Sequence, residues 1–421
     1  MSILATLSSG SLGPIGLAQQ AQIAILKATT AIPGSSSFEL QQFVNVPDGA
    51  WLAGTNSSIN GTGSFAAHGD YLVTGDGDNQ NVYVWNLSDG SLHMIVPAPS
   101  PPPQTDGWGW QIDIHGDYFI AGNGGTGGGY TTVHDVSTGA LITTITGAAR
   151  NVAINENYAV GSSLGGLQPG SGAGQIKIFE LATSTLTVLS DPNYNSSEYF
   201  GGGIEKYDIS GNNLIISSTR PNGFLVTVHD IPTALSNGNL NTASLTISPG
   251  RWFQSLEAEG NYLAVGGGNT ENEQRILIYD LTTGTLLHDL DPPEGIGWIS
   301  PGFGNSVQMS GDYLVAGYGR FAHGPVAVYD LTTGTLLQSF TIDDLPDTYS
   351  FERAGNFGSS VAITDSKTIV GIRYHKAVGW ETGDGLGAFI IYSNPEPTSS
   401  VASWTRTWSM TSDFANYVAE D

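Results

Sequence analysis

Two short stretches of the chain combine arginine, histidine and aromatic residues, the side chains that grip anionic ligands. They read "GRFAHGP" and "IRYHKAV", and the candidate ligand-binding residues in them are Arg320, Phe321, His323, Arg373, Tyr374, His375 and Lys376. A guanidinium can hold a carboxylate or sulfate by two parallel hydrogen bonds. We therefore expect a site for an acidic sugar. The alternative is ordinary loop solvation, with the arginines paired to nearby acids.

Three carboxylates share one position of a repeated element, "GDYLV" and its variants. Counting four residues back from the Asp or Asn of this element, with a one-residue shift in the last copy, gives Ala66, Asp113, Ala153, Asp208, Glu257, Gln308 and Ala362. If the copies are arranged around an axis, Asp113, Asp208 and Glu257 face one central channel, where they could bind a cation or share a proton. The alternative is a set of solvated acids in a water-filled channel.

The stretch "GDGDNQN" offers Asp76, Asp78 and Asn79, which are residue types found in calcium loops. It lacks the bidentate glutamate at the twelfth loop position that completes such a site. Calcium is therefore the one cofactor that the sequence leaves open, and we expect none otherwise.

Catalytic signatures are missing from the chain. It contains no G-x-S-x-G, phosphate-loop or H-E-x-x-H pattern, which are the arrangements that mark nucleophilic, nucleotide-binding and zinc sites. His134 and His229 occupy a repeat position that elsewhere holds Trp85, Phe179 and Tyr279, so we interpret them as packing residues. The sequence predicts a protein that is not an enzyme.

Composition restricts the possible partners. The chain has 421 residues with 57 glycines and only 12% charged residues, a balance that favours a turn-rich all-β protein. Its net charge of −25 repels phosphate backbones and anionic membranes, so we expect no nucleic acid and no membrane insertion. The absence of cysteine excludes disulfides, thiolate zinc sites and cysteine nucleophiles.

The elements that position these residues follow from the repeat. The "GDYLV" element begins near residues 69, 116, 156, 211, 260, 311 and 365, a spacing of about 49 residues. Each unit holds four short apolar runs, for example "NSVQMS", "YLVAG", "PVAVYD" and "TLLQSF". A four-stranded sheet with two apolar faces needs a neighbouring sheet on each side, and radial stacking provides them. The sequence predicts an all-β, seven-bladed β-propeller of four-stranded antiparallel blades.

The last repeat lacks an outer strand, and the segment before the first repeat can supply it. "SSFELQQFVNV" lies upstream of the first unit, and we expect Phe38–Val44 within it to close the seventh blade. An unpaired edge would otherwise remain there. The predicted organisation is an N-terminal arm over 1–37, a propeller over 38–393 and an aromatic C-terminal tail over 394–421.

Three stretches resemble known repeat families. "FGNSVQMSGDYLVAG" and "FGSSVAIT" are similar to the FG-GAP repeats of integrin-type propellers, and "VYVWNLSDGSLHMI" resembles the endings of WD-type repeats. The resemblance implies a propeller over roughly 38–393. The chain has a tight "SGDY" turn where an integrin-type calcium loop would fall, and it lacks the Gly-His signature of WD repeats. The resemblance therefore implies a fold and no binding residues.

The two faces of the predicted propeller differ. Connections such as "SGDY" and "YDLTTGTL" are short, and their acids are of the type that stabilises tight turns. The opposite face carries long, dissimilar connections such as "PAPSPPPQTDGWGW" and "DDLPDTYSFERAGNFG", where binding is usually built. A lectin-like or glycan-cleaving protein that uses this face to bind a host-surface glycan is the alternative function.

Both tails carry apolar residues that could dock on other subunits. A possible helix within 13–30 would present Ile15, Ile23 and Leu26, and the C-terminal tail contains Trp404, Trp408, Phe414 and Tyr417. No secretory signal or transmembrane segment is seen. We expect a non-enzymatic structural or recognition component of a large extracellular assembly, and a bacteriophage virion is the favoured setting.

Overall fold

The computed structural model describes the strands of the protein and the short turns between them. The described residues are 23–25, 38–45, 65–76, 80–99, 107–123, 129–147, 150–162, 175–190, 206–220, 223–240, 242–251, 253–268, 274–293, 302–318, 324–344, 355–375 and 386–395.

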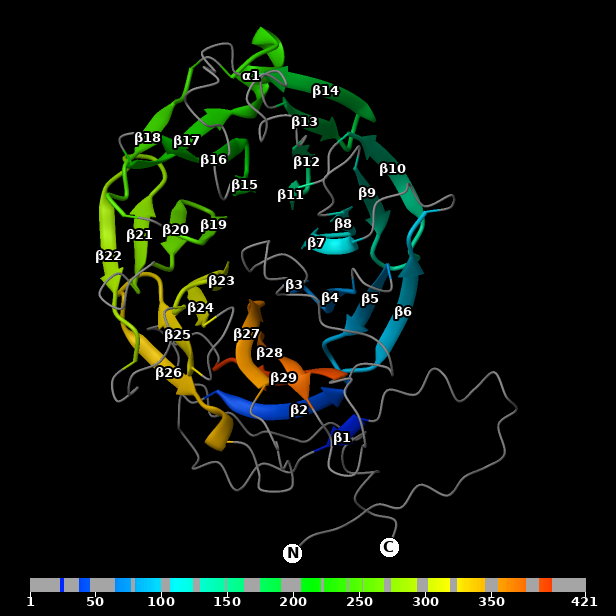
Figure 1. The fold of residues 1–421 in the computed structure, drawn as a ribbon, viewed down its shortest axis with the longest axis vertical. Coiled ribbons are helices and arrows are strands. Elements are labelled where there is room, and N and C mark those ends of the chain that lie inside the picture. The colour runs from blue at the N-terminus through cyan, green and yellow to red at the C-terminus, as the bar shows by residue number, and fades with distance from the viewer. Residues whose placement is uncertain are drawn as a thin grey trace, which may run out of the picture.

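Seven antiparallel sheets form a ring around a central axis, so the predicted seven-bladed β-propeller is confirmed (Figure 1). In each blade the first strand lies nearest the axis and the last lies on the rim. Blade 1 consists of β3 (Phe65–His68), β4 (Tyr71–Asp76), β5 (Asn81–Asn86) and β6 (Leu92–Pro97). Blade 2 consists of β7 (Trp108–His115), β8 (Tyr118–Asn123), β9 (Tyr130–Asp135) and β10 (Leu141–Thr146). Blade 3 consists of β11 (Arg150–Ile154), β12 (Tyr158–Ser162), β13 (Gln175–Glu180) and β14 (Thr185–Ser190). Blade 4 consists of β15 (Tyr207–Ser210), β16 (Asn213–Arg220), β17 (Gly223–Asp230) and β18 (Leu245–Ile247). Blade 5 consists of β19 (Ser255–Glu259), β20 (Tyr262–Gly266), β21 (Ile276–Asp280) and β22 (Leu286–Leu290). Blade 6 consists of β23 (Ser306–Ser310), β24 (Tyr313–Gly317), β25 (Val326–Asp330) and β26 (Leu336–Phe340). Blade 7 is β27 (Gly355–Ile363), β28 (Lys367–His375), β29 (Leu386–Ser393) and β2 (Glu39–Asn45), with β1 (Ile23–Ile25) added outside β2.

The apolar core is divided into seven clusters, and each lies between two neighbouring blades. The middle strands have both faces covered, which is why they are almost continuously buried, as in Tyr313–Gly317 and Val326–Asp330. No blade buries its own faces alone. The fold is therefore stabilised by contacts between repeats, as expected for radially stacked sheets.

The repeated "YDLTTGTLL" builds the turn from the third to the fourth strand. One carboxylate oxygen of Asp330 accepts hydrogen bonds from the backbone N–H groups of Thr332 and Thr333, at 2.9 and 2.8 Å. Gly334 follows with φ of 69°, and a Cβ atom there would lie 2.6 Å from Nδ1 of His288 on the preceding blade. The turn thus needs glycine for its backbone and for close packing between blades.

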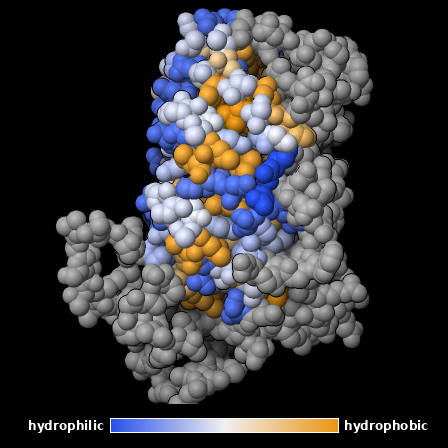
Figure 2. All heavy atoms as spheres, turned by 90° about the vertical axis from the view of Figure 1, so that its left-hand side faces the viewer, coloured by the Kyte–Doolittle hydropathy of each residue, from blue (hydrophilic) through white to orange (hydrophobic). Residues whose placement is uncertain are grey.

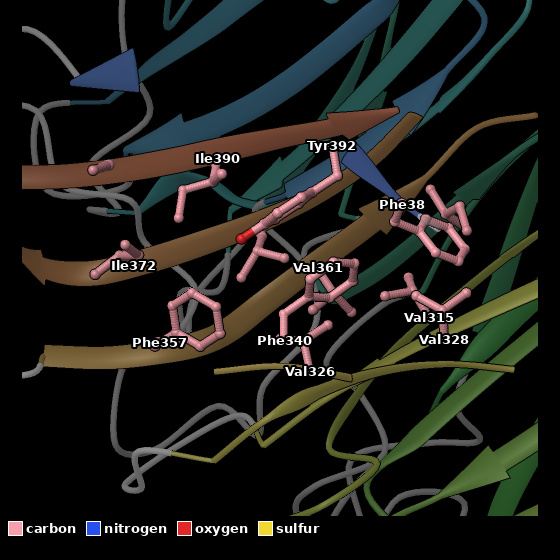
Figure 3. Close-up of a cluster of buried hydrophobic side chains, with 13 residues drawn as sticks. Phe38, Val315, Val326, Val328, Phe340, Phe357, Val361, Ile372, Ile390 and Tyr392 are labelled. Atoms are coloured by element: carbon pink, nitrogen blue, oxygen red, sulfur yellow. The ribbon is translucent and has the colours of Figure 1, made fainter. Parts of the chain in front are cut away.

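The N-terminal segment closes the ring as predicted. β2 pairs antiparallel with β29, and it begins at Glu39, one residue later than expected. Phe38 precedes the strand and packs edge-on against Phe340, with ring centroids 5.8 Å apart (Figure 3). It also packs against Tyr313, with ring centroids 6.1 Å apart. The start of the propeller is therefore wedged between blades 6 and 7.

The helix expected within 13–30 does not extend over Ile23–Ile25, because these residues form strand β1 and pair with β2. A strand satisfies the edge of β2, which a helix cannot do. The rest of the arm lies outside the described residues. The described part of the chain has one α-helix, α1 (Ile231–Asn237), and it has no helix long and apolar enough to cross a membrane.

Candidate functional site at the central channel

The innermost strands surround a cavity of about 80 Å³ on the propeller axis. All seven blades contribute to its wall, and most of the side chains that reach it are polar or charged. The polar residues that line it are Gln111, Asp113, Asn151, Lys206, Asp208, Glu257, Ser306, Gln308 and Ser360. The three acids singled out in the sequence are thus brought together, because they occupy one position of a strand that repeats around the axis.

Each of these acids also reaches the next blade around the ring. Its carboxylate accepts a hydrogen bond from a backbone N–H on the inner strand of that blade, always one residue after the equivalent repeat position. The pairs are Asp113 Oδ2 with Ile154 N at 2.8 Å, Asp208 Oδ2 with Ala258 N at 2.5 Å and Glu257 Oε1 with Met309 N at 3.5 Å. The inner edge of a blade has no further strand to satisfy its N–H groups, so these carboxylates supply the acceptors.

Asp113 and Asp208 each use the second oxygen as well. Asp113 Oδ1 accepts from the N–H of Ile114 at 2.8 Å, and Asp208 Oδ1 accepts from the N–H of Ile209 at 2.8 Å. In both cases the preceding blade has alanine at the repeat position, Ala66 or Ala153, and alanine offers no acceptor. Each aspartate therefore accepts one hydrogen bond from its own strand and one from the inner strand of the following blade.

Gln308 completes the series at the point where the ring closes. Its Oε1 accepts from the N–H of Ile363 in blade 7 at 2.9 Å, and its Nε2 donates to the carbonyl oxygen of Ala67 in blade 1 at 3.2 Å. Blade 7 carries Ala362 at the repeat position. Gln308 was counted in this ring from the sequence but was not singled out, because it has no charge.

The channel acids hold their protons more tightly than free carboxylic acids. Burial raises the pKa of Asp113 to about 6, although the N–H groups of Ile154 and Ile114 oppose the rise. Burial, and then the negative charge of Asp113, raise the pKa of Asp208. Burial and the charge of Asp208 raise the pKa of Glu257. Burial and the mutual repulsion of the three carboxylates both favour the protonated forms.

Direct metal binding finds no support at this position. The described residues contain no group of three or more histidine, cysteine, aspartate or glutamate side chains arranged to hold a metal ion. The carboxylate oxygens are directed at backbone N–H groups instead, which answers why these acids recur. Cation binding and proton sharing by these acids both stay predictions.

Lys206 lines the same cavity and was missed by the sequence analysis. It lies two residues before Asp208, and it is buried, which lowers its pKa to about 8. Gln111, Asn151 and Ser306 occupy the equivalent position in other blades. Alternate residues of a strand share a face, so counting two back from the acids would have found this polar set.

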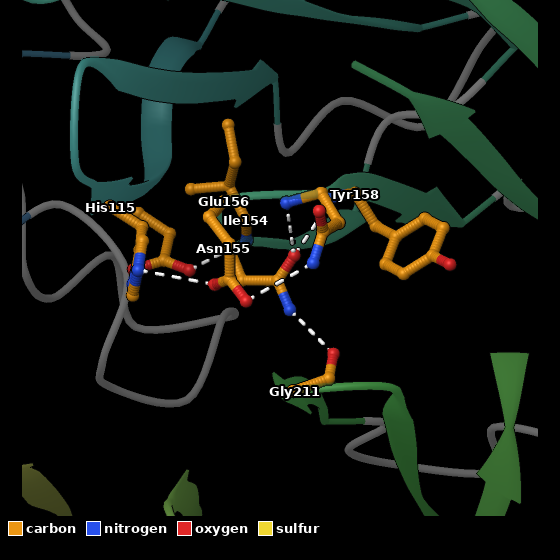
Figure 4. A network of polar contacts seen from close by, with 8 residues as sticks. His115, Ile154, Asn155, Glu156, Tyr158 and Gly211 are labelled. Carbon is orange, nitrogen blue, oxygen red and sulfur yellow. Dashed lines mark hydrogen bonds and ion pairs between the residues drawn. The ribbon is translucent and has the colours of Figure 1, made fainter. Parts of the chain in front are cut away.

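A second ring of cross-blade contacts lies two residues beyond the acids. The side-chain amide of Asn155 donates to the carbonyl oxygen of Gly211 at 2.7 Å, and His115 Nε2 lies 3.3 Å from Glu156 Oε2 (Figure 4). The rings of His68 and His115 lie 4.3 Å apart. Burial lowers the pKa of both histidines, and the proximity of His115 lowers that of His68 further. The side chains of His68 and His115 therefore connect blade 1 with blade 2, and His115 also connects blade 2 with blade 3.

The acidic-sugar site cannot be assembled from the described residues. Arg320, Phe321, His323 and Lys376 lie outside them. Arg373, Tyr374 and His375 end strand β28, and only their backbone is described. This hypothesis stays a prediction.

The remaining sequence candidates fall partly within the described chain. Asp76 is fully buried at the end of β4, whereas Asp78 and Asn79 lie outside the described residues. Ile23 belongs to β1, and the other proposed docking residues also lie outside, namely Ile15, Leu26, Trp404, Trp408, Phe414 and Tyr417.

The two histidines interpreted as packing residues are buried. His134 stacks on Phe119, with ring centroids 5.0 Å apart and planes at 7°, and its Nδ1 lies 3.0 Å from the carbonyl oxygen of Gly139. His229 Nε2 lies 3.1 Å from Thr227 Oγ1. The interpretation as packing residues is confirmed for His134.

The rim carries a repeated apolar surface that sequence reasoning did not single out. In blades 5 and 6 the register between the third and fourth strands shifts by one residue, and two successive leucines are exposed. Bulges place neighbouring side chains on the same side of a sheet. The exposed rim residues, with 41% to 50% of their surface accessible, are Leu141, Ile142, Leu186, Val188, Leu286, Leu287, Leu336 and Leu337. Figure 2 views the rim from the side of β18 and β22, where apolar patches alternate with polar ones.

No protein-family model matches the chain, and no curated protein sequence matches it. The seven-bladed architecture is therefore established by the strand arrangement itself, whereas membership in the FG-GAP or WD repeat families stays a prediction.

Proposed function

We propose that the protein is a non-enzymatic structural and recognition component of a large extracellular assembly, in which the propeller serves as an interaction scaffold. The particular setting that we propose is a bacteriophage virion, with the protein in a tail, in a fibre or on a capsid.

The apolar rim is the observation that carries this proposal. Leucine pairs are exposed at the same repeat position in blades 5 and 6, and Leu141 and Ile142 form such a pair in blade 2. These leucines keep 41–50% of their surface exposed, so complete burial of one of them yields about 1 kcal/mol, roughly half the value for a fully exposed leucine. Several such positions around a rigid ring suit a protein that is contacted from more than one side. The channel offers little competing chemistry, because its acids are engaged with backbone N–H groups.

The rim can be tested by replacing Leu286, Leu287, Leu336 and Leu337 with serine. We expect the variant to keep the thermal stability of the wild type and to lose co-sedimentation with particles from the natural source. The matched control is the double variant Asp312→Asn and Asn261→Asp, which changes exposed turn residues of the same two blades and keeps the net charge. A wild-type protein that stays monomeric in extracts of its source would contradict the proposal.

The alternative is a carbohydrate-binding or glycan-cleaving propeller. The end of strand β28 favours it, because Arg373, Tyr374 and His375 follow one another there on the long-loop face, and a guanidinium can bind a carboxylate by two hydrogen bonds. We expect binding to acidic glycans on an array, and loss of that binding in the Arg373→Ala variant. An array without signal would remove this alternative and leave the scaffold proposal untouched.

A further inference from the structure

Strand β1 covers the outer edge of blade 7, whereas no strand among the described residues covers the equivalent edge of another blade. Ile23 pairs with Val44, Ala24 with Phe43 and Ile25 with Gln42, all antiparallel on the rim side of β2. Among the described sheets, blade 7 is the only one with a fifth strand. The outer edge of a blade in this protein therefore accepts a short apolar strand.

The connection from β1 to β2 is much longer than the pairing requires. Thirteen residues separate Ile25 from Glu39, whereas an antiparallel hairpin is usually joined by two to five residues. Thirteen residues span up to roughly 45 Å when extended. That length allows β1 to reach the equivalent edge of another copy as well as its own. The strand forms the same backbone hydrogen bonds in both cases, because the two edges are identical.

The distribution of charge along the chain also favours a contact between two copies that is made by the N-terminal arm. Residues 1–38 contain Lys27 and no acidic residue, so all 38 acidic residues of the chain lie beyond them. Two propellers with this excess of negative charge repel each other, and the repulsion fades over about 8 Å at physiological ionic strength. An arm that is nearly free of charge can join two copies while their acidic surfaces stay apart.

We propose that β1 is exchanged between two copies of this chain, with the Ile23–Ile25 strand of each copy paired on β2 of the other. The contact is the same in both directions, so the exchange closes as a two-fold dimer. A pairing of three residues is short, and the dimer therefore depends on protein concentration. This inference goes beyond the scaffold function proposed above and does not depend on the identity of any partner.

The lack of native cysteine makes a clean test possible. One preparation carries Ala24→Cys and a second, with a tag of different mass, carries Phe43→Cys; these residues are register partners. The two are mixed, oxidised and separated on a non-reducing gel. We expect a disulfide-linked dimer of mixed mass. The matched control pairs Ala24→Cys with Leu337→Cys, an exposed residue on β26 of the adjacent blade, and should give at least tenfold less product.

The other results of this experiment would overturn the proposal. Mixed product no greater than the control, together with cross-linking within single chains of the Ala24→Cys, Phe43→Cys double variant, would show that β1 stays on its own blade. Equal product with Leu337→Cys would show an arm without a defined docking edge. Sedimentation provides a second measurement without cysteine. The wild type should gain dimer with rising concentration, and Ala24→Pro, which removes a backbone donor in β1, should not.

Discussion

The side-chain amide of Gln308 donates a hydrogen bond to the carbonyl oxygen of Ala67, although the two residues are 241 positions apart in the chain. The same side chain accepts from the N–H of Ile363, so one residue of blade 6 contacts blades 7 and 1. The ring is therefore closed twice, at the rim by β2 and at the hub by Gln308.

Replacement of Gln308 by alanine should destabilise the protein by about 1–3 kcal/mol, because it leaves two partly buried backbone groups without partners. Chemical denaturation followed by tryptophan fluorescence measures this change. Gln338→Ala is the matched control. Among the described residues, the amide nitrogen of Gln338 contacts only the carbonyl oxygen of the neighbouring Ser339 on the rim strand, so the stability of this variant should stay within about 0.5 kcal/mol of the wild type. Equal losses in both variants would mean that Gln308 does not join the blades.

The channel acids should make the protein less stable as the pH rises. The folded state raises the pKa of Asp113 from 3.8 to about 6, and it raises that of Glu257 from 4.5. The folded protein thus binds these protons more tightly than the unfolded chain. Their favourable contribution is complete at a pH below 3.8 and is lost as the pH rises through the folded pKa values. The lowered pKa values of His68 and His115 act in the opposite sense, because their contribution is lost as the pH falls.

Glu257→Gln isolates the effect of the acids. Within the described part of the chain Glu257 accepts a hydrogen bond through Oε1 only, and glutamine keeps that oxygen while removing the titration. We expect equal unfolding free energies for variant and wild type at pH 4, and a more stable variant at pH 8. Asp208→Asn serves as the contrast, because both oxygens of Asp208 accept N–H groups and the amide nitrogen cannot. A Glu257→Gln variant that is less stable than the wild type at pH 8 would refute this electrostatic account.

The innermost strands around the central channel, which form the hub of the propeller, show how much of the candidate site could be predicted from the sequence. Asp113, Asp208 and Glu257 were found by counting, because a residue at a fixed position of a strand repeat must face the same axis. Their role was not found, since the hydrogen-bond donors on the next blade are backbone N–H groups, and these are the same for almost every residue type. Ala66 and Ala153 looked like gaps in an acidic ring, yet they explain why the aspartates after them use both oxygens.

Less of the rim than of the hub could be predicted from the sequence. "TGTLL" predicts a strand, but the exposure of both leucines depends on a register shift that is visible only in the paired strands. The order of the blades and the closing strand followed from the repeat and from the strand missing in its last copy. The β1 strand did not, because three residues of a sequence with helical spacing carry too little signal to predict pairing on an edge.

Two turn glycines allow the cost of a positive φ angle to be measured separately from the cost of close packing between blades. Gly334 has φ of 69°, and a Cβ there would lie 2.6 Å from the ring of His288. Gly260 has φ of 55° and open space around it. Gly260→Ala should therefore cost about 1–2 kcal/mol for the backbone alone, and Gly334→Ala should cost more. Thermal unfolding measures both. His288→Ala should recover part of the loss in the Gly334→Ala background, and no recovery would mean that the packing between blades is not limiting.

Phe38→Ala tests whether the rim closure holds the ring together. Phe38 is 7% exposed, and it packs against Phe340 and Tyr313 of blade 6 while its strand belongs to blade 7. Loss of a buried phenylalanine costs about 3–5 kcal/mol, and here the loss also loosens the attachment of β2. We expect a large fall in stability and early protease cleavage between the N-terminal arm and blade 1. Leu337→Ala is the control, because that side chain is 41% exposed and should cost less than about 0.5 kcal/mol. If Phe38→Ala unfolds as the control does, the hub contacts of Gln308 and the channel acids are sufficient to keep the seven blades closed.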